Sequence, residues 1–339
     1  MRRYPRRFLS QLLPLSQLLP LFLLLSTALP LSGCVQANID VFGTPGVPYK
    51  EQVLEGKGRD KILLVTVDGL ISEHPRGGLL RSKPSTVQEV ASQLAFARRD
   101  KSIKALVLKV DSPGGTTTAS DLIYHELAEY KKATGVKVVA VMMGLGASGG
   151  YYVSLPADHI AAHPTTITGS VGVIFVMPRL AGLLDKLGVG VDVSKSGGLK
   201  DMGSPFRPAT EEEKRLTDTI TKAQAARFLG LVEQHRGLTP EAMKTVATAR
   251  VFTAQEAKEL GLVDSVGYLD ESLAKARELA GLQKDARLIT YRRRPEANAT
   301  YYQPAAESTE GQRAAVISMD GLLPPRAGLY YLWGPAYAE

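Results

Sequence analysis

The stretch "VKVVAVMMGLGASGGYY", residues 136–152, decides the fold and draws attention to one serine. Its first eight residues are apolar apart from one lysine, which is typical of a strand buried on both faces of a sheet. Glycines then surround Ser148, and a short helix is expected after Gly150. A sharp strand-to-helix turn of this kind is a place where a reactive serine is held.

Strand-like and helix-like segments alternate on both sides of this stretch. Further strands are expected at 61–69, 103–111, 158–163, 170–176 and 189–196. Helices are expected at 86–100, 120–132, 179–188, 210–237, 239–248 and 253–261. The segment 314–323 faintly repeats 62–71 and predicts one extra strand. The alternation indicates an α/β fold in which helices pack on largely parallel strands.

The first 33 residues have the pattern of a targeting segment. "MRRYPRRF" is basic, and the following 26 residues carry no charge before they end in "LSGC". This ending is similar to a bacterial lipobox, in which cleavage occurs immediately before a cysteine that is acylated, so Cys34 is the predicted lipidation site. The alternative is an uncleaved membrane anchor in which Cys34 has no special role. Cys34 is the only cysteine, which excludes an intrachain disulfide.

Composition divides the rest of the chain into segments and limits its possible partners. Residues 34–60 are rich in glycine and proline and predict a tether, residues 61–291 form the folded body, and 292–339 are a linker and C-terminal tail. The formal net charge of +7 falls to +3 once the four arginines of the N-terminal segment are removed. The body is therefore not strongly basic, and we expect no nucleic-acid partner.

Ser148 lies in a G-x-S-x-G pattern at 146–150. In α/β-hydrolases this pattern marks the nucleophile, and backbone N–H groups at the start of the next helix hold the developing oxyanion. The preceding "DSPGG" (111–115) is a sharp turn, and its Gly115 N–H is expected to face the Gly149 N–H as a second oxyanion donor. The alternatives, a structural serine and a plain loop, stay open from these motifs alone.

No histidine is a convincing base for this serine. An α/β-hydrolase places its histidine well after the nucleophile, which excludes His74 and His125. His159 and His163 follow too closely, and His235 ends a helix, where histidine complements the helix dipole. The i, i+4 spacing of His159 and His163 lies in a strand-like segment without a third ligand, so we expect no metal site.

Lysine is the other candidate base. "SKSGGLKDMGSPFRP" (194–208) places Lys200 among glycines that allow a close approach to another loop. A lysine in water has a pKa near about 10.4, and only burial lowers it enough for the amine to deprotonate a serine. The alternative, a solvated lysine beside Asp201, is favoured when this loop is considered in isolation.

Four motifs occur in a set order along the chain: "DSPGG" (111–115), "ASGGYY" (147–152), "TGSVGVIF" (168–175) and "SGGLKDMGSPFR" (196–207). Together with "ARVFTAQEAKELGLVDSVG" (249–267), they resemble the bacterial signal peptide peptidase A family, also called the protease IV family. The resemblance covers about residues 60–285. "ARVFTA" is a loose match to the family pattern, and a lipobox is less usual there than a simple signal anchor.

The resemblance implies a fold similar to the crotonase and Clp-protease families, a spiral of repeated β-β-α units. It also implies a Ser–Lys dyad, in which Ser148 is the nucleophile and Lys200 the general base. Ser170 matches a hydroxyl that orients the lysine amine, and Gly115 and Gly149 match the oxyanion donors. No metal or cofactor is implied.

The resemblance further implies a homo-oligomer in which the serine and lysine of one site come from neighbouring protomers. The expected protein is a membrane-associated serine endopeptidase of the bacterial cell envelope, with its body outside the cytoplasm. Its expected substrates are cleaved signal peptides and other short hydrophobic polypeptides.

Two other functions stay open. The first is a crotonase-like enzyme that acts on acyl thioesters, although such enzymes usually lack this serine and lysine. The second is a non-catalytic envelope lipoprotein, although a binding protein has no need of Ser148, Lys200 and Ser170 together.

Overall fold

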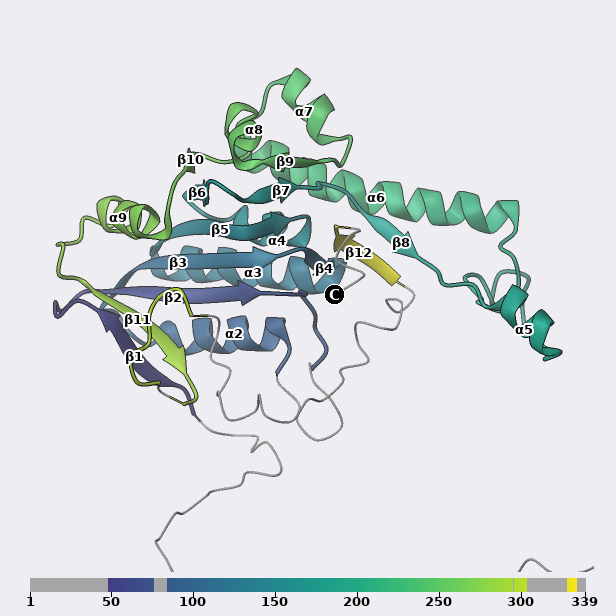
Figure 1. Cartoon of the computed structure of the whole chain (residues 1–339), viewed down its shortest axis with the longest axis horizontal. Helices are drawn as coiled ribbons and strands as arrows, with labels where there is room; N and C mark the ends of the chain where they lie inside the picture. The colour runs from purple at the N-terminus through teal and green to yellow at the C-terminus, as the bar shows by residue number, and fades with distance from the viewer. Residues whose placement is uncertain (1–47, 76–83, 295, 304–327, 334–339) are drawn as a thin grey trace, which may run out of the picture. The chain divides into compact units, whose positions relative to one another are not determined.

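A nine-stranded sheet forms the centre of the protein (Figure 1). The structure is a computed structural model that describes residues 48–75, 84–294, 296–303 and 328–333. The predicted targeting segment, Cys34 and the predicted strand at 314–323 lie outside these residues. The strands of the sheet are β1 (Lys50–Glu55), β2 (Lys61–Asp68), β3 (Ile103–Ser112), β5 (Lys137–Ala147), β6 (His159–Ala162), β7 (Ile167–Gly169), β9 (Val251–Thr253), β10 (Ser265–Val266) and β11 (Arg287–Arg292).

The strand order is β1-β11-β2-β3-β5-β6-β10, and β7 joins β5 on one side and β9 on the other. Strands β2, β3 and β5 run parallel in the middle, and their side chains are almost all apolar and buried. Both faces of these strands are covered, which explains why the sequence shows continuous apolar runs rather than alternation.

The described chain contains eight helices: α2 (Thr86–Ala97), α3 (Thr117–Thr134), α4 (Gly149–Ser154), α5 (Ala181–Leu187), α6 (Glu211–Arg236), α7 (Pro240–Val246), α8 (Ala254–Glu259) and α9 (Leu269–Leu279). Residues of α2, α3, α4 and α6 belong to one buried apolar cluster, and residues of α9 belong to the other. The α/β fold class expected from the alternation is therefore confirmed. None of these helices has the length and apolar character of a membrane span.

The longest helix, α6, begins where the sequence predicts. Thr210 caps it, and its hydroxyl accepts the N–H of Glu213 while the Glu213 carboxylate accepts the N–H of Thr210. Gly237 ends the helix with a φ of 55°, in the left-handed region that favours glycine. This capping box fixes the start of α6 next to the loop that carries Lys200.

A second, three-stranded sheet was not expected. It consists of β4 (Gly114–Thr116), β12 (Gly328–Leu332) and β8 (Ile174–Val176), with β12 antiparallel to both neighbours. Residues 328–332 were expected in a tail and residues 50–55 in a tether, whereas both form strands. Each depends on a partner far away in the chain, which local sequence patterns do not reveal.

Two predicted strands are wrong in whole or in part. Residues 170–173 are not a strand, and the expected strand at 170–176 is reduced to β8. Residues 189–196 are not a strand either, and Val189, Val191 and Val193 are 45–50% exposed. Their apolar alternation has the period of a strand, but it is not buried against any part of the described chain.

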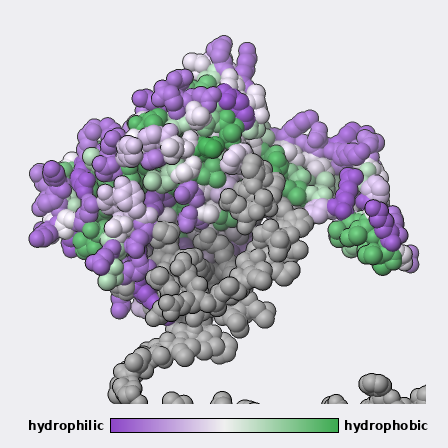
Figure 2. Space-filling model, in the orientation of Figure 1, coloured by the Kyte–Doolittle hydropathy of each residue, from purple (hydrophilic) through white to green (hydrophobic). Residues whose placement is uncertain are grey.

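Residues 177–209, which we call the arm, connect β8 to α6 and contain α5 and Lys200. Figure 2 shows hydrophobic surface gathered where Figure 1 places α5. The exposed apolar side chains of the arm are Leu180, Leu183, Leu187, Val189, Val191, Val193, Leu199 and Phe206. A contiguous apolar surface of this kind is typical of a protein-protein contact.

Candidate active site

Ser148 stands at the turn between β5 and α4 in a strained conformation. Its φ is 52° and its ψ is −115°, outside the usual regions for a residue with a side chain. The Ser148 N–H donates to the Gly169 carbonyl at 2.7 Å, and its own carbonyl accepts the Tyr152 N–H at 2.9 Å. The residue is 1% exposed, and its Oγ has no hydrogen-bond partner among the described residues. A buried, strained and unpartnered hydroxyl is typical of a functional position.

Glycines let the backbone pack tightly around Ser148. A β-carbon on Gly149 would lie 2.5 Å from Ser120 Oγ and 3.1 Å from the backbone nitrogen of Gly115. A β-carbon on Gly115 would collide with the carbonyl of Ile71. Gly115 and Gly149, the predicted oxyanion donors, therefore have backbones in contact beside Ser148, because neither residue carries a side chain.

Ser170 is placed by the same part of the sheet. Ala147 of β5 pairs with Gly169 of β7, so Ser148 and Ser170 each follow the last paired residue of their strand. Ser170 is 9% exposed, has a φ of 51°, and donates its N–H to the Arg250 carbonyl at 2.9 Å. The structure thus brings the predicted nucleophile and the predicted lysine-orienting serine to neighbouring strand ends.

Lys200 lies apart from this cluster within one chain. It is exposed, in a turn of the arm where a β-carbon added to Gly197 or Gly198 would meet nothing within 4 Å in the described chain. Since Ser148 Oγ has no partner among the described residues, Lys200 Nζ does not bond to it in the single chain. A dyad of these two residues requires the arm of another chain or a different arm position.

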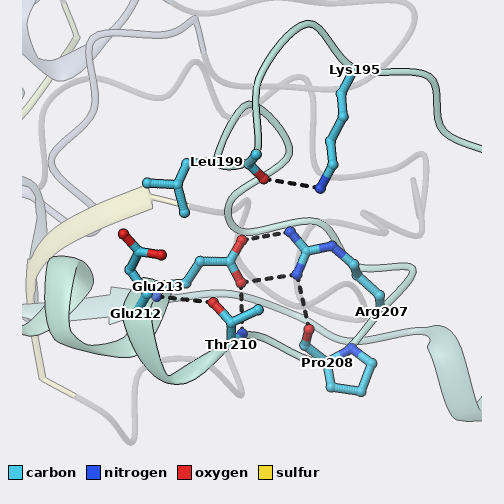
Figure 3. A pocket seen from close by; sticks show the side chains of 8 residues that line it. Lys195, Leu199, Arg207, Pro208, Thr210, Glu212 and Glu213 are labelled. Carbon is cyan, nitrogen blue, oxygen red and sulfur yellow. Dashed lines mark hydrogen bonds and ion pairs between the residues drawn. The ribbon is translucent and has the colours of Figure 1, made fainter.

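An ion-pair network that the sequence did not lead us to expect lies in the arm near Lys200, and Figure 3 shows the part of it that joins Arg207 to Glu213. Arg207 donates to Asp201 at 2.7 and 2.8 Å and to Glu213 at 2.5 and 2.9 Å. Lys195 adds a bond to Asp201 at 2.8 Å. No regular spacing in the sequence marks this network, because residues 201–207 lie in turns and irregular loop.

The network lowers the pKa values of the two carboxylates that it binds. The bonds from Arg207, followed by those from Lys195, keep the pKa of Asp201 well below its usual range. The bonds from Arg207 and the Thr210 backbone lower the pKa of Glu213 to about 2. Asp201, a neighbour of Lys200 in the sequence, is therefore engaged by Arg207 and Lys195.

The three histidines that follow Ser148 in the sequence form hydrogen bonds with other side chains. His159 Nε2 bonds to Ser265 Oγ at 2.8 Å, His163 Nδ1 to Thr165 Oγ1 at 2.9 Å, and His235 Nε2 to the Tyr124 hydroxyl at 2.8 Å. Within the described ranges, no three His, Cys, Asp or Glu side chains are grouped as metal ligands.

Comparison with known proteins identifies the family to which the chain belongs. The family model "Peptidase family S49" matches residues 130–283, and the model "Clp protease" matches residues 81–166. The putative signal peptide peptidase SppA of Enterococcus faecium is 35% identical over 243 residues, which are 72% of this chain and 70% of that protein. A putative protease of Synechocystis sp. is 37% identical over 67% of this chain and 77% of that protein.

Among solved structures, a membrane-bound stomatin-specific protease matches with a TM-score of 0.40 and 17% identity over 65% of this chain and 86% of that one. The Clp-protease match and the α/β sheet agree with the predicted relation to Clp proteases. The identities of the relatives and the share of their length that is matched confirm the resemblance found in the sequence motifs. The chain belongs to peptidase family S49.

Proposed function

We propose that this protein is a membrane-associated serine endopeptidase of the bacterial envelope, with a catalytic dyad formed by Ser148 of one protomer and Lys200 of its neighbour. Its substrates are cleaved signal peptides and other short hydrophobic polypeptides, in line with the name of the Enterococcus faecium relative. The observation that carries the proposal is the buried, unpartnered Ser148 Oγ, combined with a Lys200 exposed on an apolar arm.

The proposed mechanism needs only groups of this chain. The uncharged Lys200 amine takes the proton of Ser148, and Ser148 Oγ attacks the peptide carbonyl. The N–H groups of Gly115 and Gly149 hold the oxyanion, and the lysine returns its proton to the leaving amine. Water, activated by the same lysine, then releases the acyl group. Ser170 orients the amine.

The arm gives the reason for assigning Lys200 to a neighbour. Its exposed apolar side chains gain stability when a second copy covers them. The same contact would remove Lys200 from water, which disfavours its charged form and favours the form that accepts a proton. Because Asp201 is held by Arg207 and Lys195, its carboxylate is directed to those cations. Ring closure by such head-to-tail contacts would give a homo-oligomer.

Attachment to the membrane is assigned to the N-terminus. We propose that Cys34 is acylated, that residues 1–33 are removed, and that the peptidase body lies outside the cytoplasm. Cys34→Ser should shift the protein to the soluble fraction and abolish incorporation of labelled palmitate. Retention of the variant in the membrane at its wild-type level would instead favour an uncleaved anchor.

Mixing two inactive variants tests the dyad. Ser148→Ala and Lys200→Ala should each lower kcat by about 10⁴-fold or more, because the residues act as one unit. When the two are unfolded together and reassembled 1:1, a site with both native residues forms at about a quarter of the contacts in a head-to-tail ring. Activity should therefore return to about a quarter of the wild-type value.

Lys186→Ala, an exposed lysine in the last turn of α5, is the matched control and should keep full activity. Mixtures that stay inactive, although native mass spectrometry shows mixed oligomers, would place both residues in one chain. Full activity of Lys200→Ala alone would remove the lysine from the mechanism.

A further inference from the structure

Asp201 directly follows Lys200 in the sequence, yet its carboxylate is bound to two other cations. Arg207 Nε donates to one carboxylate oxygen at 2.8 Å, and Arg207 Nη2 donates to the other at 2.7 Å. Lys195 Nζ donates to that second oxygen at 2.8 Å. The Asp201 side chain is 13% exposed. Both of its oxygens therefore accept from a charged donor within the arm.

Turns of the arm hold Lys200 and Asp201 close together. The N–H of Lys200 donates to the Gly197 carbonyl at 3.1 Å, and the N–H of Ser204 donates to the Asp201 carbonyl at 3.0 Å. Arg207 Nη2 also donates to the Asp201 carbonyl, at 3.3 Å. A lysine carries its charge on a long, flexible stem, which can turn back to a neighbouring carboxylate. Without its present partners, the Asp201 carboxylate would be available to the Lys200 ammonium.

Arg207 is held from its other side by α6. Its Nη1 and Nη2 donate to the Glu213 carboxylate at 2.9 and 2.5 Å (Figure 3). Glu213 is 2% exposed and is fixed in turn by the capping box with Thr210. A guanidinium that is bound by two carboxylates has little freedom, because both sets of bonds fix the plane of the same fork. The position of Arg207 therefore does not depend on Asp201 alone.

Lys195 is the weaker of the two partners of Asp201. Its side chain is 34% exposed and contacts only one of the two carboxylate oxygens. An exposed pair of this kind contributes little, because solvent screens it and a flexible side chain must be ordered. The charged groups that face Asp201 in the described chain are thus Lys195 and Arg207 from the arm, with Glu213 of α6 behind Arg207. Of these, Arg207 supplies the fixed positive charge.

The negative charge of Asp201 bears on the proposed base. Lys200 accepts the proton of Ser148 only when its amine is uncharged. An opposite charge within about 4–6 Å favours the charged form of a titrating group. The bonds from Arg207, followed by those from Lys195, keep the pKa of Asp201 well below its usual range, so its carboxylate is ionised wherever a lysine titrates. An unshielded Asp201 would therefore keep Lys200 protonated to higher pH.

We propose that Arg207 is a positioning residue of the peptidase, which engages Asp201 and so prevents this carboxylate from pairing with the Lys200 ammonium. The inference rests on the proposed function, in which Lys200 is the general base. Arg207 acts through Asp201 and Lys200 rather than on the substrate. Its effect is to lower the pH above which Lys200 takes the proton of Ser148.

The pH dependence of Ser148 labelling by a fluorophosphonate tests this role without knowledge of the natural peptide. The second-order rate constant of the full chain is measured from pH 6 to 10, and its acid limb reports the essential base of the free enzyme. In Arg207→Gln this limb should move to higher pH by about one to two units. Labelling at pH 7 should therefore slow about ten- to a hundredfold, whereas the rates should converge with those of the wild type on the alkaline plateau. An equal loss at every pH would overturn the proposal, because a misplaced loop slows the reaction at all pH values.

Removing the carboxylate as well gives the decisive comparison. When Arg207→Gln is combined with Asp201→Asn, the acid limb should return to its wild-type position, because no exposed carboxylate is left beside Lys200. The double variant still lacks the link from Arg207 to Glu213, so its Tm should stay below that of the wild type. Recovery of the limb without recovery of Tm separates the electrostatic role from a structural one. A limb that stays displaced in the double variant would overturn the proposal.

Asp201→Asn alone gives a measurement that does not require Arg207→Gln to fold. Because Arg207 already engages the carboxylate, the acid limb should stay in place. A shift to lower pH by one unit or more would show that Asp201 is unshielded in the native protein, which would overturn the proposal. Arg215→Gln is the matched control, since Arg215 is exposed in α6 and lies outside the network. A shift as large as that of Arg207→Gln in this control would refute a specific role of Arg207.

Labelling of the wild type and of Lys200→Ala distinguishes failure of this inference from failure of the proposed function. If the wild type labels, Lys200→Ala does not, and Arg207→Gln keeps the wild-type limb, the role of Arg207 is refuted and the dyad stands. If the wild type does not label at any pH, or if Lys200→Ala labels at the wild-type rate, the proposed function falls, and the role of Arg207 with it.

Discussion

The surroundings of Ser148 and those of Lys200 use glycine in opposite ways. A β-carbon on Gly115 collides with backbone, and one on Gly150 would lie 2.6 Å from the Ser112 carbonyl. In contrast, β-carbons on Gly197 and Gly198 meet nothing within 4 Å in the described chain. The surroundings of Ser148, which we call the closed half, are therefore shaped by one chain, whereas those of Lys200, the open half, leave room for the second copy that we propose.

Gly115→Ala attacks the closed half and should have the largest effect. The new methyl group collides with Ile71 and displaces the N–H that we assign to the oxyanion. We expect kcat to fall on the order of a hundredfold or more, as for the loss of one oxyanion donor. Steady-state hydrolysis by purified protein measures this, and circular dichroism checks the fold. A folded variant with wild-type kcat would contradict the role of Gly115.

Lys109→Met removes a buried charge from β3 in the central sheet. Lys109 is 5% exposed and donates to the carbonyls of Tyr301, Tyr302 and Gln303 at 2.9–3.2 Å. Burial lowers its pKa to about 8 from an ordinary 10.5, despite the nearby Asp68 and Asp111. Between these values the unfolded chain binds more protons, so the free energy of unfolding should rise with pH.

The expected rise between pH 8 and 10 is about 2 kcal/mol in the wild type, and it should be missing from Lys109→Met. Urea unfolding at several pH values measures the difference. The tyrosines with raised pKa values act in the opposite direction only as the pH approaches their unfolded value of 10. Equal slopes in both proteins would show that Lys109 is not protonated differently on folding.

Arg207→Ala probes the open half. There Arg207 pairs with Asp201 of the arm and with Glu213 of α6, and so links the arm to that helix. The variant should unfold at a lower temperature at pH 7, because Asp201 and Glu213 lose their partner. The low pKa of Glu213 means that this stabilisation is present above about pH 4.5 and is lost as the pH falls towards 2. The difference in Tm should therefore shrink across that range, and a constant difference would point to lost packing instead.

Gly198→Ala should have the smallest effect on stability and is the sharpest test of the comparison. Because the methyl group enters open space in the described chain, Tm should change by less than about 1 °C at a concentration where the protein is monomeric. If a neighbour covers the arm, the same substitution should weaken assembly, measured by sedimentation. A change in monomer stability equal to that of Gly115→Ala would refute the contrast.

Much of the closed half could be predicted from the sequence. The apolar runs of β2, β3 and β5 predict buried parallel strands, and the structure confirms them. The glycine pattern around Ser148 predicts the turn, because a left-handed φ and close backbone contacts need small residues. The helix expected at 210–237 also matches α6, Glu211–Arg236, to within one residue at each end.

The remainder depends on partners that no local pattern identifies. Val189, Val191 and Val193 alternate like a strand, yet no described strand pairs with them, so period alone is misleading. Strand β12 has only five residues, and it forms because β4 and β8 offer two edges at once. The pairing of Ser148 with Lys200 stays a prediction, since it depends on a contact between chains.

The ladder between β5 and β7 has a consequence for protein engineering. Ser148 and Ser170 leave the sheet at the same rung, where Ala147 pairs with Gly169. Adding or deleting one residue in either strand would slide one hydroxyl past the other by about 3.3 Å, with every side chain of the site unaltered. Designers of related enzymes should therefore preserve the length of both strands.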